Sequence, residues 1–245
     1  MMKSYLSLVL LFAFGCRYSH NDLHLQSSKL QKFESATTSV DSATLALIKP
    51  YSDSLSGIMG KVVAHSEVEM TNKRPEGLLG NFITDAVYNY VKTSLLPKEP
   101  FCVVINGGGL RAPLPKGDIT VGRIYETLPF ENTLVILKLE RKQIDALVER
   151  IMSKKGEPVS HLNIVSNGGK NSWTIQNDQT ESTYIYVATS DYLANGNDGY
   201  DIFKNALQKI ETGLNFRDVM FLQLQEYQRT NTPIAPQLER RISFE

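Results

Sequence analysis

The chain has 245 residues, of which 26 are Lys or Arg and 26 are Asp or Glu, so its formal net charge is zero. Because 42% of the residues are hydrophobic, disorder over most of the length is excluded, and the zero charge disfavours a nucleic-acid partner. Two cysteines and four histidines cannot build a disulfide framework and leave little material for a self-contained metalloenzyme.

The N-terminus has the pattern of an export signal. Residues 1–16 contain Lys3 and then an apolar stretch that is shorter than the roughly 20 residues of a membrane-spanning helix. The stretch ends in AFGC, which resembles a bacterial lipobox with Cys16 as the lipidated residue; the alternative is a plain signal peptide cut nearby. Because two acyl chains give stable anchoring, we expect an exported cell-envelope lipoprotein held at the periplasmic face or the outer surface of a membrane.

The remainder of the chain divides into a tether and a folded domain. Residues 17–45 are rich in polar side chains and lack a sustained period, which predicts a flexible tether. Residues 46–245 are long enough for one large domain. Cys102 lies inside an apolar run, where we expect it to be a small buried side chain.

The domain is predicted to mix strands and helices without a fixed repeat. Residues 58–68 are rich in β-branched side chains and predict a strand, whereas apolar residues at helical spacing predict a helix over 78–94. The continuous apolar run at 101–105 predicts a buried strand. The other predicted elements are strands at 132–139, 172–175, 183–188 and near Ile242, and helices at 141–153 and 215–228, the last with Asn215 as its N-cap.

A glycine loop follows the buried strand. Gly107, Gly108 and Gly109 permit positive φ and close backbone approach, so that N–H groups can turn toward an anion while Arg111 adds a cation. A dinucleotide-binding fingerprint is rejected, because Pro113 and a second proline soon after it prevent the helix that this motif requires. On the spacing alone, a tight structural turn with a solvated arginine remains the alternative.

Three further segments contain candidate binding residues. Lys73 and Arg74 lie in a turn before the first predicted domain helix, where a solvated charge pair is the simpler interpretation. The string DYLANGNDGY combines two turn signals and could present Tyr192 and Asp198 to a ligand, or form a hairpin with a surface tyrosine. Phe130, in LPFEN, would by itself be interpreted as a core residue.

Taken in order, three strings resemble the C-terminal domain of the 5'-nucleotidase and UDP-sugar hydrolase family, secreted enzymes that remove phosphate from nucleotides. The strings are PEGLLGNFITDAV, VINGGGLRAPLPKGDITVGRIYETLPFENTLVILKL and YVATSDYLANGNDGYDIF, between Pro75 and Phe203. The resemblance implies an α+β fold, a mixed and layered α/β/β/α domain, that binds nucleotides.

The resemblance also implies roles for individual residues. Phe130 and Tyr192 would hold the base between two rings, although the family usually carries phenylalanine at the second position. Asp198 would accept hydrogen bonds from the ribose hydroxyls. Asn106 would be polar toward base or sugar, and Arg111 would place its cation near ligand oxygens.

The rest of the implied substrate-binding set is a loop and a basic pair. Gly107, Gly108 and Gly109 belong to the implied loop. The family's basic residue before the first helix aligns with Lys73, and Arg74 stands beside it, so either could serve. A lysine cannot reproduce the two parallel hydrogen bonds of an arginine to a phosphate.

Full-length members of the family carry a metallophosphoesterase domain in which Asp, His and Asn side chains hold two metal ions. The residues before Lys73 contain no GDxxD, NHE or HxH string. We therefore expect no catalytic residue, cofactor or metal site in this chain, and divalent metals in a separate catalytic partner, because such metals activate the attacking water. The chain alone is expected to be inactive.

Two hypotheses follow, and the first is favoured. In the first, the lipoprotein is the nucleotide-binding part of a split 5'-nucleotidase, and it supplies substrate recognition to a separate metallophosphoesterase chain in nucleotide catabolism. In the second, it is a stand-alone envelope protein that binds nucleotides or nucleosides without catalysis. A degenerate scaffold is a third, less favoured possibility.

Overall fold

The computed structural model describes residues 41–245 except 97, 177, 179 and 180. The predicted signal peptide, its Cys16 and residues 17–40 of the predicted tether lie outside the described residues. The chain divides into two compact units, Met1–Leu47 and Ile48–Glu245. Among the residues that the structure describes, no helix is both long and apolar enough to cross a membrane.

The first described helix, α2, spans Ser42–Met59. The Asp41 carboxylate accepts a hydrogen bond from the Ala43 N–H at 3.1 Å, which accounts for the start of the helix. The helix covers the first residues of the strand predicted over 58–68. Strand β1 is limited to Val62–Ser66, because α2 occupies the positions up to Met59.

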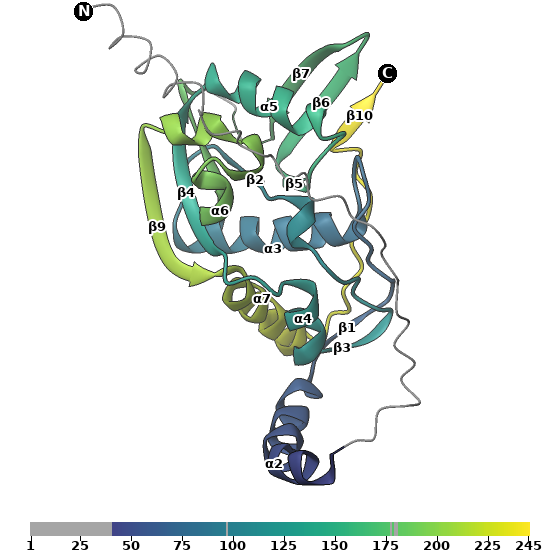
Figure 1. Ribbon diagram of the computed structural model, residues 1–245. Helices are drawn as coiled ribbons and strands as arrows, with labels where there is room; N and C mark the ends of the chain where they lie inside the picture. The colour runs from purple at the N-terminus through teal and green to yellow at the C-terminus, as the bar shows by residue number, and fades with distance from the viewer. Residues whose placement is uncertain (1–40, 97, 177, 179–180) are drawn as a thin grey trace, which may run out of the picture. The chain divides into compact units, whose positions relative to one another are not determined.

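A mixed five-stranded sheet forms the centre of the second unit (Figure 1). Its order is β5-β2-β8-β4-β9. Strand β8 is parallel to β2 and antiparallel to β4, and the edge strands β5 and β9 are antiparallel to their neighbours. The strands are β2 (Phe101–Val104), β4 (Thr133–Glu140), β5 (Val159–Ser160), β8 (Tyr184–Ser190) and β9 (Gln208–Asn215).

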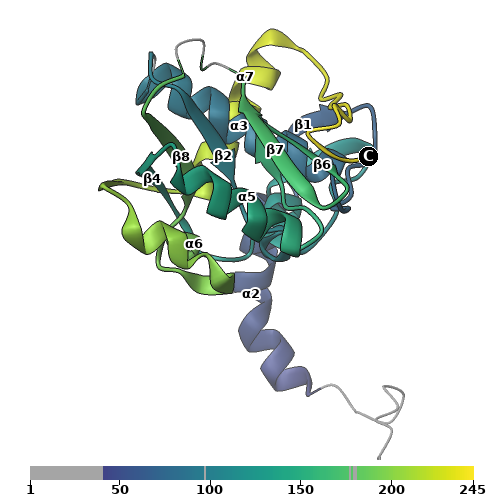
Figure 2. The same cartoon turned by 90° about the horizontal axis from the view of Figure 1, so that it is seen from above.

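Helices cover both faces of this sheet. Along β2, Phe101 and Val103 pack into one hydrophobic cluster with helices α3 and α7, whereas Cys102 and Val104 pack into a second cluster with α5 and α6. Figure 2 shows the two pairs of helices on opposite sides of the strands. The helices are α3 (Leu78–Ser94), α5 (Gln143–Ser153), α6 (Asp191–Ala194) and α7 (Phe216–Thr230).

Two smaller sheets and several short helices complete the α+β domain. Strand β1 pairs with β3, and a three-stranded sheet has the order β10-β6-β7. The remaining elements are β3 (Gly117–Thr120), α4 (Val121–Thr127), β6 (Leu162–Asn167), β7 (Lys170–Ile175), β10 (Ile242–Phe244), and the 3-10 helices η2 (Gly107–Gly109), η3 (Asn197–Gly199) and η4 (Asp201–Asn205).

Several local predictions are confirmed. Helix α3 has the predicted bounds, and Asn215 caps α7, where its side chain and that of Asp218 form a reciprocal capping box. Cys102 is fully buried, and burial raises the pKa of its thiol to about 12. Strand β9 was not predicted, because it is an edge strand with mostly polar, exposed side chains.

His161 occupies a half-buried position beside β5. Its ring stacks on that of Tyr88, and its Nδ1 lies 2.9 Å from the Ser160 hydroxyl, which donates to the Asp85 carboxylate at 2.6 Å. Burial lowers the pKa of His161 to about 4; the Asp85 charge opposes this shift and the Arg241 charge supports it. The imidazole is therefore neutral in the folded protein near neutral pH.

We predict that the free energy of unfolding falls as the pH is lowered from about 6.5 toward 4. In this range the unfolded chain, whose histidine has an ordinary pKa, binds a proton more readily than the folded chain. Urea unfolding at pH 7.0, 5.5 and 4.5 measures the dependence, and His161→Gln should make it shallower. His65→Gln, at an exposed position on β1, is the control; equal slopes for the wild type and His161→Gln would contradict the prediction.

Candidate functional site

The candidate site is a cleft of about 400 Å³ at one end of the central sheet, where β2 and β8 end. Strands β2 and β8 are parallel, and β4, which is antiparallel to β8, begins there, with Leu134 paired to Ser190. The loops that adjoin these three strand ends therefore meet. The cleft is lined by Asn106, Gly108, Arg111, Phe130, Asn132, Tyr192 and Asp198.

Two large aromatic side chains are exposed at this cleft. Phe130 is 44% exposed and Tyr192 is 38% exposed, although 62 positions separate them along the chain. Phe130 is thus not the core residue that its sequence context alone would suggest. An apolar ring left in contact with water at a cleft is suited to stack on a planar ligand.

The loop that presents Phe130 is held by a buried guanidinium. Arg217, 5% exposed in the first turn of α7, donates hydrogen bonds to the carbonyl oxygens of Leu128 at 2.8 Å and Phe130 at 3.0 Å, and pairs with the Glu131 carboxylate. Sequence reasoning missed this residue. A signal was present, because the helix dipole disfavours a cation in the first turn of a helix.

The glycine loop is closed onto the protein. Gly107 donates its N–H to the buried carboxylate of Glu157 at 2.6 Å, its carbonyl accepts from the Asn72 amide at 2.7 Å, and Gly109 donates to the Asn106 carbonyl at 3.0 Å. None of Gly107, Gly108 and Gly109 has a positive φ. The predicted cradle of backbone N–H groups is therefore partly occupied. Close approach favours glycine at 107, since a Cβ there would lie 3.0 Å from Glu157 Oε2 and this carboxylate would have to shift by a few tenths of an ångström.

The two basic residues before α3 lie outside the set that lines the cleft. Arg74 pairs with Glu157 at 3.2 Å and donates to the carbonyls of Lys154 and Gly156. Lys73 borders a separate small cavity. Arg74 is thus connected to the glycine loop through Glu157, and, of the described residues that line the cleft, Arg111 carries the positive charge.

Arg111 lies over the ring of Phe130. The distance from its guanidinium carbon to the ring centroid is 5.2 Å, which is within the range of a cation–π contact. One face of the Phe130 ring therefore lies next to a positive charge. A ligand stacked on this ring could place an anionic group near the guanidinium.

Asp198 and Tyr192, which also line the cleft, are joined by a hydrogen bond. The Tyr192 hydroxyl donates to Asp198 Oδ1 at 3.0 Å, and this hydrogen bond together with the Asp198 charge raises the pKa of the Tyr192 hydroxyl. Asp198 has the left-handed φ of 53°, and its carbonyl accepts from Arg150 Nε at 2.9 Å. Arg150 was not predicted to support the site.

The start of helix α6 is held by hydrogen bonds to Ser190 and Asp191. Ser190 accepts the N–H of Leu193 at 3.2 Å, and Asp191 accepts the N–H groups of Tyr192 at 2.9 Å and Thr133 at 3.0 Å. The Asp191 carboxylate therefore connects the start of α6 to the start of β4. These contacts place the Tyr192 ring relative to the loop that contains Phe130.

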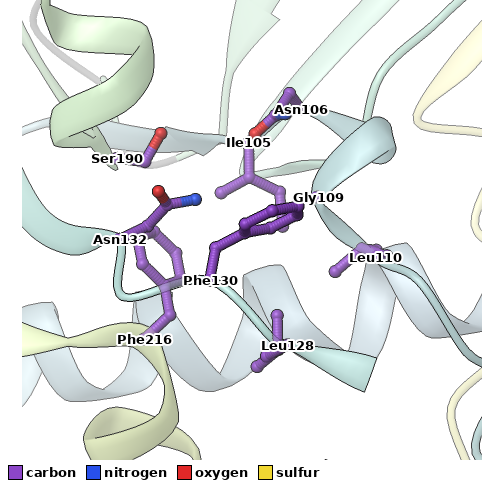
Figure 3. Close-up of a pocket in the computed structure, with 9 residues that line it drawn as sticks. All are labelled: Ile105, Asn106, Gly109, Leu110, Leu128, Phe130, Asn132, Ser190 and Phe216. Atoms are coloured by element: carbon purple, nitrogen blue, oxygen red, sulfur yellow. The ribbon is translucent and has the colours of Figure 1, made fainter. Parts of the chain in front are cut away.

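A smaller, more apolar pocket adjoins the cleft. The two share Asn106, Phe130 and Asn132, whose side chains are partly exposed. Figure 3 shows the lining side chains around the Phe130 ring. The remaining lining residues are Ile105, Gly109, Leu110, Leu128, Ser190 and Phe216. The combined site offers rings for stacking, amides for hydrogen bonding, a carboxylate and a guanidinium.

The described histidines and acidic residues do not fit a metal centre. Within the part of the chain that the structure describes, no group of three or more His, Cys, Asp or Glu side chains could hold a metal ion. His65 pairs with Asp118 at 3.0 Å, and His161 stacks on Tyr88.

Comparisons with known proteins agree with the fold and the motifs. Residues 62–205 match the family 5'-nucleotidase, C-terminal domain. The chain is 28% identical over 221 residues to the trifunctional nucleotide phosphoesterase protein YfkN of Bacillus subtilis, covering 78% of this chain and 14% of YfkN. It is 28% identical over 195 residues to the 5'-nucleotidase of Mus musculus, covering 68% of this chain and 33% of that protein.

A solved structure is similar over most of the described domain. The 5'-nucleotidase precursor from Thermus thermophilus superimposes with a TM-score of 0.66 and 29% identity, covering 82% of this chain and 42% of that one. The chain therefore spans less than half the length of each of these three proteins.

We predict that Arg217→Ala lowers the free energy of unfolding by about 1.5–3 kcal/mol, because buried carbonyl oxygens lose a charged donor. Urea unfolding at pH 7 measures the change. Glu131→Gln is the matched control: it keeps the Arg217 hydrogen bonds to the carbonyls and removes an exposed charge, so a change below about 1 kcal/mol is expected. Equal effects of the two substitutions would contradict the assigned role.

Proposed function

Since the chain belongs to the 5'-nucleotidase family, through the C-terminal domain matched over residues 62–205, we propose that this domain binds a nucleoside monophosphate for hydrolysis of its phosphate ester. The metals and catalytic groups would belong to a separate metallophosphoesterase chain. The observation that carries the proposal is the joint presence of Phe130, Tyr192, Asp198 and Arg111 in one cleft.

The base would stack between the rings of Phe130 and Tyr192. Stacking of a base on an aromatic ring contributes about 1–3 kcal/mol, and it tolerates different bases because each has a π-face. The amides of Asn106 and Asn132, which line the same cleft, would hydrogen-bond to the base edge or the sugar. An amide offers both donors and an acceptor, so these residues add orientation to the stacking.

The sugar and the phosphate would bind at opposite charges. Asp198 would accept hydrogen bonds from the ribose hydroxyls, and Arg111 would lie near ligand oxygens at the phosphate end. A guanidinium suits this role, because it can form two parallel hydrogen bonds to a phosphate. Arg74 would contribute indirectly, since its contact with Glu157 supports Gly107.

We propose that this domain binds the substrate and that a partner chain holds the metals. Metal ions in such hydrolases activate water and stabilise the in-line displacement, and the described residues offer no cluster for them. In the proposed arrangement, the bound nucleotide would meet metals held by a partner chain. We further propose that Cys16 is lipidated and anchors the protein at the cell envelope, which would place this activity in nucleotide catabolism outside the cytoplasm.

A second candidate function is nucleotide or nucleoside binding without catalysis. The position of Arg74 favours it, because its guanidinium is engaged by Glu157 and by two carbonyls, while Lys73 borders another cavity. Arg111 would then bear the phosphate contact alone. Such a site would distinguish AMP from adenosine weakly.

We predict that Phe130→Ala and Tyr192→Ala each weaken AMP binding by about fivefold to 150-fold, because each removes a stacking surface worth about 1–3 kcal/mol. Isothermal titration calorimetry with the purified protein measures the dissociation constants. Tyr184→Ala removes a ring of similar exposure, 41%, that does not line the cleft, and should leave binding unchanged. Unaltered binding in both cleft variants would show that the stacking assignment is wrong.

We predict that the chain releases no phosphate from AMP by itself, but raises the rate of a metallophosphoesterase-domain partner supplied with a divalent metal. The physical reason is that the cleft contributes substrate binding while the partner contributes activated water. Phosphate release is measured for each protein alone and for the mixture. A mixture no faster than the partner alone would contradict the split enzyme and leave the binding function.

A further inference from the structure

The hydroxyl of Tyr192 has no role in stacking, yet it makes a specific contact. It donates to Asp198 Oδ1 at 3.0 Å, and both residues line the cleft. A phenylalanine would supply the same stacking ring, so the hydroxyl is an addition that changes the surroundings of the carboxylate. Resting on the proposed function, we propose that the Tyr192 hydroxyl reduces discrimination between ribonucleosides and deoxyribonucleosides.

The contact is supported by the backbone on both sides. The Asn197 amide donates to the Tyr192 carbonyl at 2.9 Å, and Arg150 donates to the Asp198 carbonyl at 2.9 Å. Tyr192 also donates its N–H to Asp191 at 2.9 Å. These contacts anchor the main chain of both residues, from which the hydroxyl and the carboxylate meet at hydrogen-bonding distance.

The effect on the two sugar types follows from the number of donors available. A ribose has adjacent 2′- and 3′-hydroxyls, which can donate one hydrogen bond to each carboxylate oxygen of Asp198. With the Tyr192 hydroxyl on Oδ1, one ribose hydroxyl would have to share that oxygen with it, and a second hydrogen bond to the same oxygen is weaker than the first. The ribonucleoside thus gains less from its second hydroxyl than it would beside a phenylalanine.

A deoxyribonucleoside experiences the opposite effect. It lacks one hydroxyl, and in a phenylalanine-containing site it would leave a carboxylate oxygen without a protein or sugar donor. An oxygen deprived of its partner in a bound complex weakens binding. Here the Tyr192 hydroxyl continues to donate to Oδ1, so the loss is smaller. Both effects bring the affinities of the two sugars closer together.

The test compares Tyr192→Phe with the wild type, because phenylalanine keeps the stacking ring and removes the hydroxyl. Calorimetry gives dissociation constants for adenosine, 2′-deoxyadenosine and 3′-deoxyadenosine. We expect the ratio of the deoxyadenosine constant to the adenosine constant to rise by about threefold to tenfold in Tyr192→Phe, for at least one deoxy form, which corresponds to one typical hydrogen bond at a partly exposed site.

Asp198→Ala provides the second arm. In this background the acceptor of the Tyr192 hydroxyl is gone, so adding Tyr192→Phe should leave the same ratio unchanged, and a double-mutant cycle isolates the contact. A ratio that is equal or lower in Tyr192→Phe for both deoxyadenosines would overturn the inference while leaving nucleoside binding intact. Wild-type protein that binds none of the three nucleosides would overturn the proposed function and the inference with it.

Discussion

The candidate site depends on the pairing of β8 with two neighbours of opposite direction. Parallel pairing with β2 and antiparallel pairing with β4 bring two strand ends and one strand start to the same end of the sheet. The glycine loop, the Phe130 loop and α6 must then meet, although they are far apart in the sequence. A register shift of one residue in β8 would turn its buried side chains to the opposite face and move Tyr192 away from the cleft.

Buried charges fix the loops once the sheet has brought them together. Glu157, 3% exposed, joins Arg74 to Gly107, and Arg217 joins α7 to the carbonyls of the Phe130 loop. In both cases a charged group is satisfied by backbone atoms or by an opposite charge, which offsets the cost of removing it from water. The exposed cleft residues are therefore supported by buried residues that do not line the cleft.

Local sequence patterns predicted the helices and strands whose hydrophobic residues recur with a clear period. They did not predict contacts between residues that are far apart in the sequence. Helix α3 followed from its apolar spacing, and Asn215 from capping chemistry. Edge strand β9 was missed because its side chains are mostly polar. Motif order singled out six of the seven residues that line the cleft, all except Asn132. Glu157 and Arg217 act on residues 50 and 87 positions away. Such long-range contacts produce no repeating pattern that could be recognised in a single amino-acid sequence.

The Arg217 contact also constrains when the site can form during biosynthesis. A growing polypeptide exposes the glycine loop and Phe130 first, while α7, which begins at Phe216, is still to be made. Until that helix docks, the carbonyls of Leu128 and Phe130 lack their guanidinium donor. The cleft can therefore take its final form only after α7 has been made and has docked, because this helix carries the guanidinium that holds the Phe130 loop.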